Sequence, residues 1–167
     1  MPADPADSDV PADSDAPAFR SLALDVMPRP DHVDMTAVTL PAGATTDPAA
    51  WTAAIFSIES TPVWVRLLFG LRQLLVPLIG VRPGDPGTAF AVRRVVGEEA
   101  LVEASDRHLD FAAGIGVDAE RRLVRLVTVV RLHGWRGRLY FAPVALVHPA
   151  VVRSMMRRAA RRLASGR

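Results

Sequence analysis

The sequence contains no cysteine and no lysine among its 167 residues. The absence of cysteine excludes disulfide bonds, thiolate zinc sites and cysteine nucleophiles, and it suits a reducing compartment. The absence of lysine excludes Schiff-base chemistry and the lysine of a phosphate-binding P-loop. The Gly-x-Ser-x-Gly elbow and the His-Glu-x-x-His motif are also missing, which sets aside serine hydrolases and metalloproteases. Four histidines remain as candidate ligands.

The charges are distributed unevenly along the chain. All 20 basic residues are arginine, and the net charge is only +2. Residues 1–60 nevertheless carry ten acidic residues against two arginines, whereas residues 121–167 carry twelve arginines and no acidic residue. An asymmetry of this kind can orient an encounter with an acidic partner.

Composition also predicts the domain organisation. Residues 1–18 are almost entirely Pro, Ala, Asp and Ser, which predicts a disordered acidic leader. Residues 19–167 have the length and apolar content of a single domain. The chain opens without a basic or apolar signal region, so we expect a cytoplasmic location. The apolar stretch 63–81 is interrupted by two arginines and a proline, which favours a buried or interfacial helix over a membrane span.

The first half of the domain combines one strand with helices. Residues 34–40 are rich in β-favouring residues and end at Pro-Ala-Gly, which predicts a strand. An N-cap at Thr46 or Asp47 followed by proline predicts a helix that ends near Ser60. A second helix is predicted over 61–80 from the spacing of its leucines, and a loop follows at 81–87.

After that loop the apolar residues alternate. We predict strands over 89–96, 100–105, 108–117 and 122–133. Their short connections imply an antiparallel meander. Helical spacing returns near the C-terminus, and we predict that the long final helix begins at Pro149.

Three sequence blocks carry a family resemblance. They are Asp-Arg-His-Leu-Asp-Phe at 106–111, Val-Val-Arg-Leu-His at 129–133 and Gly-Arg-Leu-Tyr-Phe-Ala-Pro-Val at 137–144. These blocks resemble a bacterial family catalogued as domain of unknown function 2867, and the order of elements resembles the helix-grip superfamily of START-like lipid carriers and polyketide cyclases. The resemblance implies an α+β fold in which a curved antiparallel sheet grips a long C-terminal helix. It implies no reaction.

A glycine pattern at Gly114-Ile-Gly116 does not predict a dinucleotide site. It lies inside a predicted strand that turns directly into another strand, so no helix N-terminus is available for a pyrophosphate. We therefore expect no cofactor.

The strands 108–117 and 122–133 each have one apolar face. Opposed residues of an antiparallel pair point to the same side, so the apolar faces coincide only when paired residue numbers sum to an odd value. A two-residue turn at 119–120 predicts a register in which Phe111 opposes Thr128 on the core side.

The same register gathers polar side chains on the other side of the sheet. It opposes His108 to Arg131 and puts Asp110 one diagonal step from that arginine. With His133, they are candidates for an anion-binding or acid–base site. The alternative is a solvated face whose ion pairs contribute roughly 0–1 kcal/mol each. We expect no metal site, because nothing directs these side chains at one point.

The helix-grip resemblance implies a largely apolar pocket between the sheet and the terminal helix. The alternative is that the residues there simply fill the core. The candidate ligand-binding residues are Trp51, Phe56, Phe90, Phe111, Thr128, Tyr140 and Met155.

The terminal helix is rich in arginine. Arg153, Arg157 and Arg161 are candidates for contact with an anionic membrane or an acidic protein. The alternative is a solvated face. No aromatic residue lies between these arginines, so we expect no nucleic-acid partner.

Three functional hypotheses follow. The first is a non-catalytic domain that binds a small hydrophobic or amphipathic ligand between sheet and helix. The second is a cyclase-, isomerase- or hydratase-like enzyme that uses His108 or His133 as the acid or base. The third is an interaction or membrane-surface module that uses the arginine-rich helix and the apolar segment 63–81.

Overall fold

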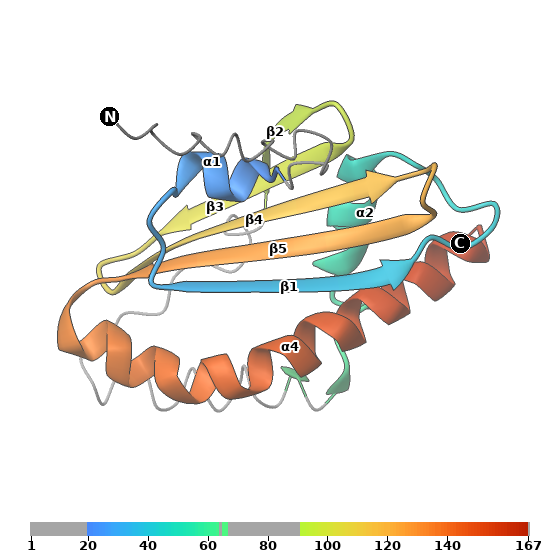
Figure 1. Ribbon diagram of the computed structural model, residues 1–167. Helices are drawn as coiled ribbons and strands as arrows, with labels where there is room; N and C mark the ends of the chain where they lie inside the picture. The colour runs from blue at the N-terminus through green and yellow to red at the C-terminus, as the bar shows by residue number, and fades with distance from the viewer. Residues whose placement is uncertain (1–19, 64, 67–90, 167) are drawn as a thin grey trace, which may run out of the picture.

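The computed structural model describes residues 20–63, 65–66 and 91–166 (Figure 1). The predicted leader 1–18, the loop 81–87 and Phe90 lie outside these residues, as does most of the predicted helix 61–80. In chain order the described elements are α1 (Leu22–Val26), β1 (His32–Thr39), α2 (Pro48–Ile55), β2 (Val92–Val96), β3 (Glu99–Ser105), β4 (Leu109–Asp118), β5 (Leu123–Leu132) and α4 (Gly134–Ala164).

The five strands form one antiparallel sheet in the order β1-β5-β4-β3-β2 (Figure 1). The strands β2 to β5 pair as consecutive hairpins, which confirms the predicted meander. The strand β1 pairs with β5 and forms the opposite edge. A curved sheet, short helices and a long C-terminal helix make up the expected α+β fold of the helix-grip type.

The helix α2 begins where the sequence predicts. The carboxylate of Asp47 accepts hydrogen bonds from the backbone N–H groups of Ala49 (2.9 Å) and Ala50 (3.2 Å), and Pro48 occupies the first turn. The helix ends at Ile55, before the predicted Ser60. The Ser57 hydroxyl donates to the Ala54 carbonyl (2.9 Å), a local bond that competes with further helix.

The start of α4 was predicted wrongly. The helix begins at Gly134 and continues through both Pro143 and Pro149. A proline removes one helical hydrogen bond and crowds the preceding turn, but tertiary contacts on both sides can hold the helix together. Before the prolines, Phe141 packs edge-to-face on the ring of His32, with the ring centroids 4.9 Å apart. After them, the helix enters the core.

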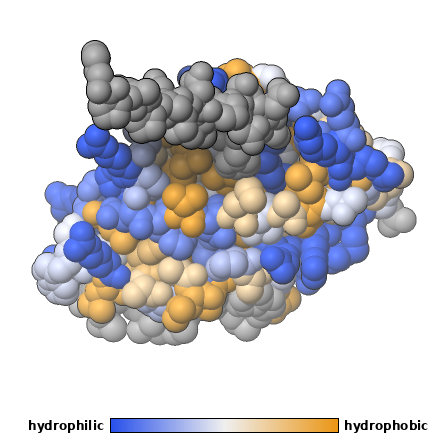
Figure 2. All heavy atoms as spheres, in the orientation of Figure 1, coloured by the Kyte–Doolittle hydropathy of each residue, from blue (hydrophilic) through white to orange (hydrophobic). Residues whose placement is uncertain are grey.

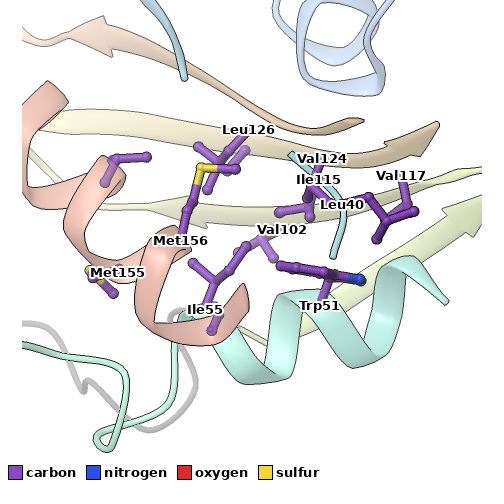
Figure 3. Packing of buried hydrophobic residues seen from close by; sticks show 13 residues of the cluster. Leu40, Trp51, Ile55, Val102, Ile115, Val117, Val124, Leu126, Met155 and Met156 are labelled. Carbon is purple, nitrogen blue, oxygen red and sulfur yellow. The ribbon is translucent and has the colours of Figure 1, made fainter. Parts of the chain in front are cut away.

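The main core lies between the sheet and the helices α2 and α4 (Figure 3). Trp51 of α2 and Met156 of α4 are fully buried there, against Ile115 of β4 and Leu126 of β5. The Trp51 indole N–H donates to the Thr45 carbonyl (2.8 Å), which satisfies its one polar atom. The apolar side of the meander therefore packs on the last helix, as predicted.

The other face of the sheet carries the short helix α1, which the sequence did not predict. Ala23 of α1 and Met27, its C-cap residue, belong to a second buried cluster that includes Leu101, Ala112 and Val129. The helix is capped by Ser21, whose hydroxyl accepts a hydrogen bond from the Ala23 N–H (3.3 Å). Both faces of the sheet are thus partly covered.

The register of β4 and β5 differs from the prediction by two residues. Phe111 opposes Val130 instead of Thr128, so the paired numbers still sum to an odd value. The turn has four residues, 119–122, because the Asp118 carboxylate accepts from the Arg121 N–H (2.7 Å) and pairs with its guanidinium (2.9 Å). The longer turn slides β5 along β4 while keeping the apolar faces together.

Candidate functional site

Three neighbouring strands bring polar side chains together on the α1 face. Asp110 of β4 directly opposes both Ser105 of β3 and Arg131 of β5. Opposed residues point to the same side of a sheet, so these three side chains lie in a row across the strands. The predicted diagonal relation between Asp110 and Arg131 becomes a direct cross-strand pair in the observed register.

The carboxylate of Asp110 is held from two sides. Its Oδ1 accepts a hydrogen bond from the Ser105 hydroxyl (2.6 Å), and its Oδ2 lies 3.0 Å from Nε2 of His133. The bond from Ser105, followed by the interactions with His133 and Arg131, lowers the pKa of Asp110 below its ordinary value despite partial burial. Asp110 is therefore an ionised anchor at neutral pH that orients the His133 ring.

His133 and Asp110 remain accessible to solvent, with side chains 41% and 29% exposed. His133 is also the N-cap residue of α4, so the start of that helix fixes its backbone. An accessible imidazole hydrogen-bonded to a carboxylate has the arrangement of a general base with its orienting group.

The fourth predicted member, His108, does not join this group. Its backbone carbonyl accepts from the His133 N–H (2.8 Å), but its ring has no hydrogen bond or ion pair within the described residues. A Cβ atom at Gly137 would collide with that carbonyl, so the first turn of α4 lies against His108. The structure thus brings together Asp110, Arg131 and His133, and adds Ser105.

An open hollow of about 410 Å³ lies beside this network. Its apolar wall comes from the end of α1 and from β4, and its charged groups come from β2, β3, β4 and β5. The lining residues are Val26, Met27, Arg93, Glu103, Ala104, Ser105, Asp110, Phe111, Ala112 and Arg131. Sequence reasoning missed Arg93, Glu103 and the α1 residues, because their proximity depends on a register and a helix that the sequence pattern did not reveal.

Most of the candidate ligand-binding residues that the structure describes lie on the other side of the sheet, although Phe111 also lines the hollow. Trp51 and Met155 are buried in the main core, and Phe56 and Phe111 pack against it. Thr128 is 2% exposed. Tyr140 is half-buried on α4, and ligand contact by any of these residues stays a prediction.

A polar contact between β1 and α4 was not anticipated. Asp34 and His148 are paired, with 3.0 Å between Oδ2 and Nδ1, and their side chains are only 16% and 18% exposed. In the same strand Val33 and Met35 are 50% and 56% exposed. The sequence signal for this contact was the alternation of polar and apolar residues from His32 onward. The polar Asp34 faces α4, whereas the apolar Val33 and Met35 face away from that helix. This pair fastens the first half of α4 to the edge of the sheet.

The two glycines of the Gly114-Ile-Gly116 pattern make room for a partly buried ion pair. A Cβ at Gly114 would overlap the carboxylate of Glu99, and one at Gly116 would lie 2.7 Å from Cζ of Arg125. The Glu99 carboxylate accepts from the Ser21 hydroxyl (2.7 Å) and lies 3.4 Å from Nη2 of Arg125. These glycines thus let charged side chains lie across the sheet beneath α1.

Within the residues that the structure describes, no group of three or more His, Asp or Glu side chains could hold a metal ion.

A second groove, of about 500 Å³, runs between the end of β1 and the C-terminal half of α4. Arg153, Arg157 and Arg161 line one wall at four-residue spacing. None of these three forms an ion pair or hydrogen bond through its guanidinium with a described residue. Arg162 differs, because it donates to the Ser57 hydroxyl (2.7 Å).

The helix α4 is also long and apolar enough to cross a membrane by length and composition alone. Its most apolar 18-residue window has a mean hydropathy of 1.3, and 22% of that window is buried. Core helices of soluble proteins can meet the same criterion, and the second half of α4 does contribute to the core.

Comparison with known proteins finds a family model that matches most of the chain. The model of a family described as "Protein of unknown function (DUF2867)" matches residues 26–155. The matched region includes Asp110, Arg131 and His133. No curated protein and no solved structure matches the chain.

Proposed function

The chain belongs to the DUF2867 family, and we propose that it binds a small amphipathic molecule with an anionic end in the hollow on the α1 face. The observation that carries this proposal is a hollow of about 410 Å³ in which an apolar wall meets two arginines. Binding sites for small molecules typically have volumes of roughly 300–1,000 Å³ and combine apolar walls with a few polar groups.

The charges around the hollow favour an anion. Both carboxylate oxygens of Asp110 are already engaged, by Ser105 and His133. Arg93 and Arg131 form no ion pair within 4.0 Å among the described residues, so their donors are available to a ligand. A guanidinium can bind a carboxylate or phosphate through two parallel hydrogen bonds. Glu103 lines the same hollow and opposes an anion, which limits the affinity.

The apolar part of the ligand has a wall to pack on. Val26 is 39% exposed at the end of α1, and Met27 and Ala112 lie beside it. Met27 and Ala112 are only 6% and 2% exposed, so among these three Val26 supplies most of the surface that a ligand would cover, at about 25 cal/mol for each Å² of apolar surface removed from water.

This proposal moves the ligand from the predicted position to the opposite face of the sheet. The space next to the second half of α4 is filled by side chains of the main core (Figure 3). We retain as proposals the kinship with START-like proteins, which the order of elements supports, the bacterial origin that goes with the family resemblance, and a cytoplasmic location, which the absence of cysteine suits.

Octanoate is a suitable probe because it joins one carboxylate to a short apolar chain. We expect it to bind the full chain, as measured by calorimetry, and to bind more tightly than octanol. Arg131→Gln should weaken octanoate binding about 10-fold or more, since a hydrogen bond to a charged group contributes roughly 1.5–3 kcal/mol. Glu103→Gln should strengthen it by removing a repelling charge.

Arg107→Gln is the matched control, because Arg107 is exposed and does not line the hollow. Octanoate affinity that is the same in Arg131→Gln and Arg107→Gln would contradict the proposal, as would the absence of binding.

The contact between His133 and Asp110 favours acid–base catalysis as a second candidate function. Nε2 of His133 and Oδ2 of Asp110 lie 3.0 Å apart, within the distance required of a base and its orienting carboxylate, and Asp110 lines the hollow. Proton abstraction from 5-nitrobenzisoxazole tests for such a base without knowledge of the substrate. His133→Ala should reduce the rate to that of the uncatalysed reaction, whereas His108→Ala should leave it unchanged; equal loss in both variants would reject His133 as the base.

A further inference from the structure

One side of α4 is exposed along almost its whole length. Trp135, Leu139 and Leu146 in the first half, and Arg153, Arg157 and Arg161 in the second, are all exposed. They follow one another at steps of four or seven residues, which places them on one side of a helix. The exposed stripe of α4, as we call these six residues, is therefore apolar in its first half and cationic in its second.

The apolar half of the stripe is unusually accessible. The side chains of Trp135, Leu139 and Leu146 are 68%, 56% and 84% exposed. Figure 2 shows a mainly apolar surface over the first half of α4, at the lower left, and a hydrophilic surface over its second half. Trp135 also has the guanidinium of Arg136 at 5.4 Å from its ring centroid, so a cation lies next to the aromatic ring.

No acidic group among the described residues neutralises the cationic half of the stripe. Its three arginines line the groove of about 500 Å³ beside β1. The helix α4 contains no acidic residue, and no described carboxylate pairs with these arginines. Three unpaired guanidinium groups along one groove attract phosphate groups.

We propose that the exposed stripe of α4 rests on the surface of an anionic lipid membrane. The arginines would contact lipid phosphates while Trp135, Leu139 and Leu146 enter the boundary between headgroups and acyl chains, a combination typical of interfacial helices. The opposite side of α4 packs on the sheet through Val152, Met155 and Met156. The helix therefore lies in the plane of the membrane surface and does not span the bilayer.

The apolar half favours a membrane over a nucleic acid. Arginines suffice to bind a phosphate backbone, which would leave the two leucines without a partner. A lipid surface accounts for both halves of the stripe. The surface lies across the sheet from the hollow near α1, so the inference is independent of the proposed ligand site.

The test is co-sedimentation of the full chain with vesicles of phosphatidylcholine alone or with 30% phosphatidylglycerol. We expect binding to the anionic vesicles that weakens as salt is added, and much weaker binding to the neutral ones. The variant Arg153→Gln/Arg157→Gln/Arg161→Gln should bind anionic vesicles on the order of 100-fold less well, from about 1 kcal/mol for each arginine near the surface.

A matched control changes the same net charge elsewhere. Arg29, Arg94 and Arg107 are exposed and lie outside α4, so replacing all three with Gln should reduce binding less than about 3-fold. Equal losses in the two triple variants would show attraction by net charge alone and would overturn the proposal.

The apolar half is tested separately. Leu139→Ser/Leu146→Ser should weaken vesicle binding on the order of 10-fold, because less apolar surface enters the membrane. Val33→Ser/Met35→Ser is the control, since these residues are also apolar and exposed, at 50% and 56%, but lie on β1. Equal binding by both double variants would overturn the proposal. So would tight binding to a 20-base-pair DNA duplex without binding to vesicles, which would identify the stripe as a nucleic-acid surface.

Discussion

The two faces of the sheet carry different kinds of side chain. The face toward α2 and α4 is filled with apolar side chains and buries Trp51 and Met156 completely. The face toward α1 combines a smaller apolar cluster with the partly buried Glu99–Arg125 pair and the more accessible Asp110–His133 pair. The first face therefore supplies most of the stability, and the second has the polar groups and open space that binding requires.

This difference shows that charged residues on a strand do not by themselves mark a solvated face. Glu99 is 6% exposed because α1 lies over it and because Gly114 leaves space for its carboxylate. Only a few residues away, Asp110 and Arg131 stay beyond the cover of α1 and line the hollow. The short helix α1 thus covers the Glu99–Arg125 pair but leaves the candidate binding groups, Asp110 and Arg131, open to solvent.

The largest expected effect on stability comes from a substitution in the core between the sheet and the helices α2 and α4. Met156→Ala should lower the free energy of unfolding by about 2–5 kcal/mol, because a fully buried side chain leaves a cavity. Met35→Ala removes the same atoms from a residue that is 56% exposed and should cost less than about 0.5 kcal/mol. Urea denaturation measures both, and similar values for the two variants would refute the assignment of the core to this face.

An intermediate effect is expected under α1. Glu99→Gln keeps the size of the side chain but removes the charge that pairs with Arg125 and accepts from Ser21. We expect a loss of about 1.5–3 kcal/mol, with faster hydrogen exchange in α1 than in α4.

The neighbouring residue provides the control for that change. Glu98 is exposed in the turn before β3, and Glu98→Gln should be nearly neutral. If both variants lose the same small amount, the ion pair beneath α1 does not fasten that helix.

The smallest effect concerns Asp110 and depends on pH. Its pKa is lowered in the folded chain, first by the bond from Ser105, so the folded state binds fewer protons than the unfolded state. The stability it contributes is present above its ordinary pKa of about 4 and is lost as the pH falls through its lowered folded value. Asp110→Asn should therefore cost about 1 kcal/mol or less at pH 7 and nothing at strongly acidic pH.

Urea midpoints measured from pH 7 to pH 2 test this dependence. The curves of the wild type and Asp110→Asn should converge as the pH falls, and Ser105→Ala should show part of the same change. A constant difference at every pH would mean that the ionised carboxylate is not responsible.

The sequence was most informative where local rules decide the structure. The Asp47-Pro48 cap, the alternating strands and the odd-sum rule for β4 and β5 predicted α2, the meander and the shared apolar face. They did so because capping and alternation act over a few neighbouring residues.

Tertiary contacts decided what the sequence could not predict. The helix α4 passes through Pro149 because Phe141 and Met156 hold it on both sides of the proline. The register shifted by two because Asp118 bonds within the turn. The sequence predicted Asp110, Arg131 and His133 as members of the polar cluster. It missed Ser105, because that residue lies on β3 and the predicted register concerned only β4 and β5.

The most direct test of the account is an octanoate titration of the chain carrying ¹³C-methyl methionine, followed by NMR. Met27 lines the hollow on the α1 face, whereas Met155 and Met156 lie in the core on the opposite face. We expect the methyl signal of Met27 to move with octanoate concentration while those of Met155 and Met156 stay fixed. Movement of Met155 and Met156 with Met27 unchanged would place the ligand between sheet and helix and contradict the account.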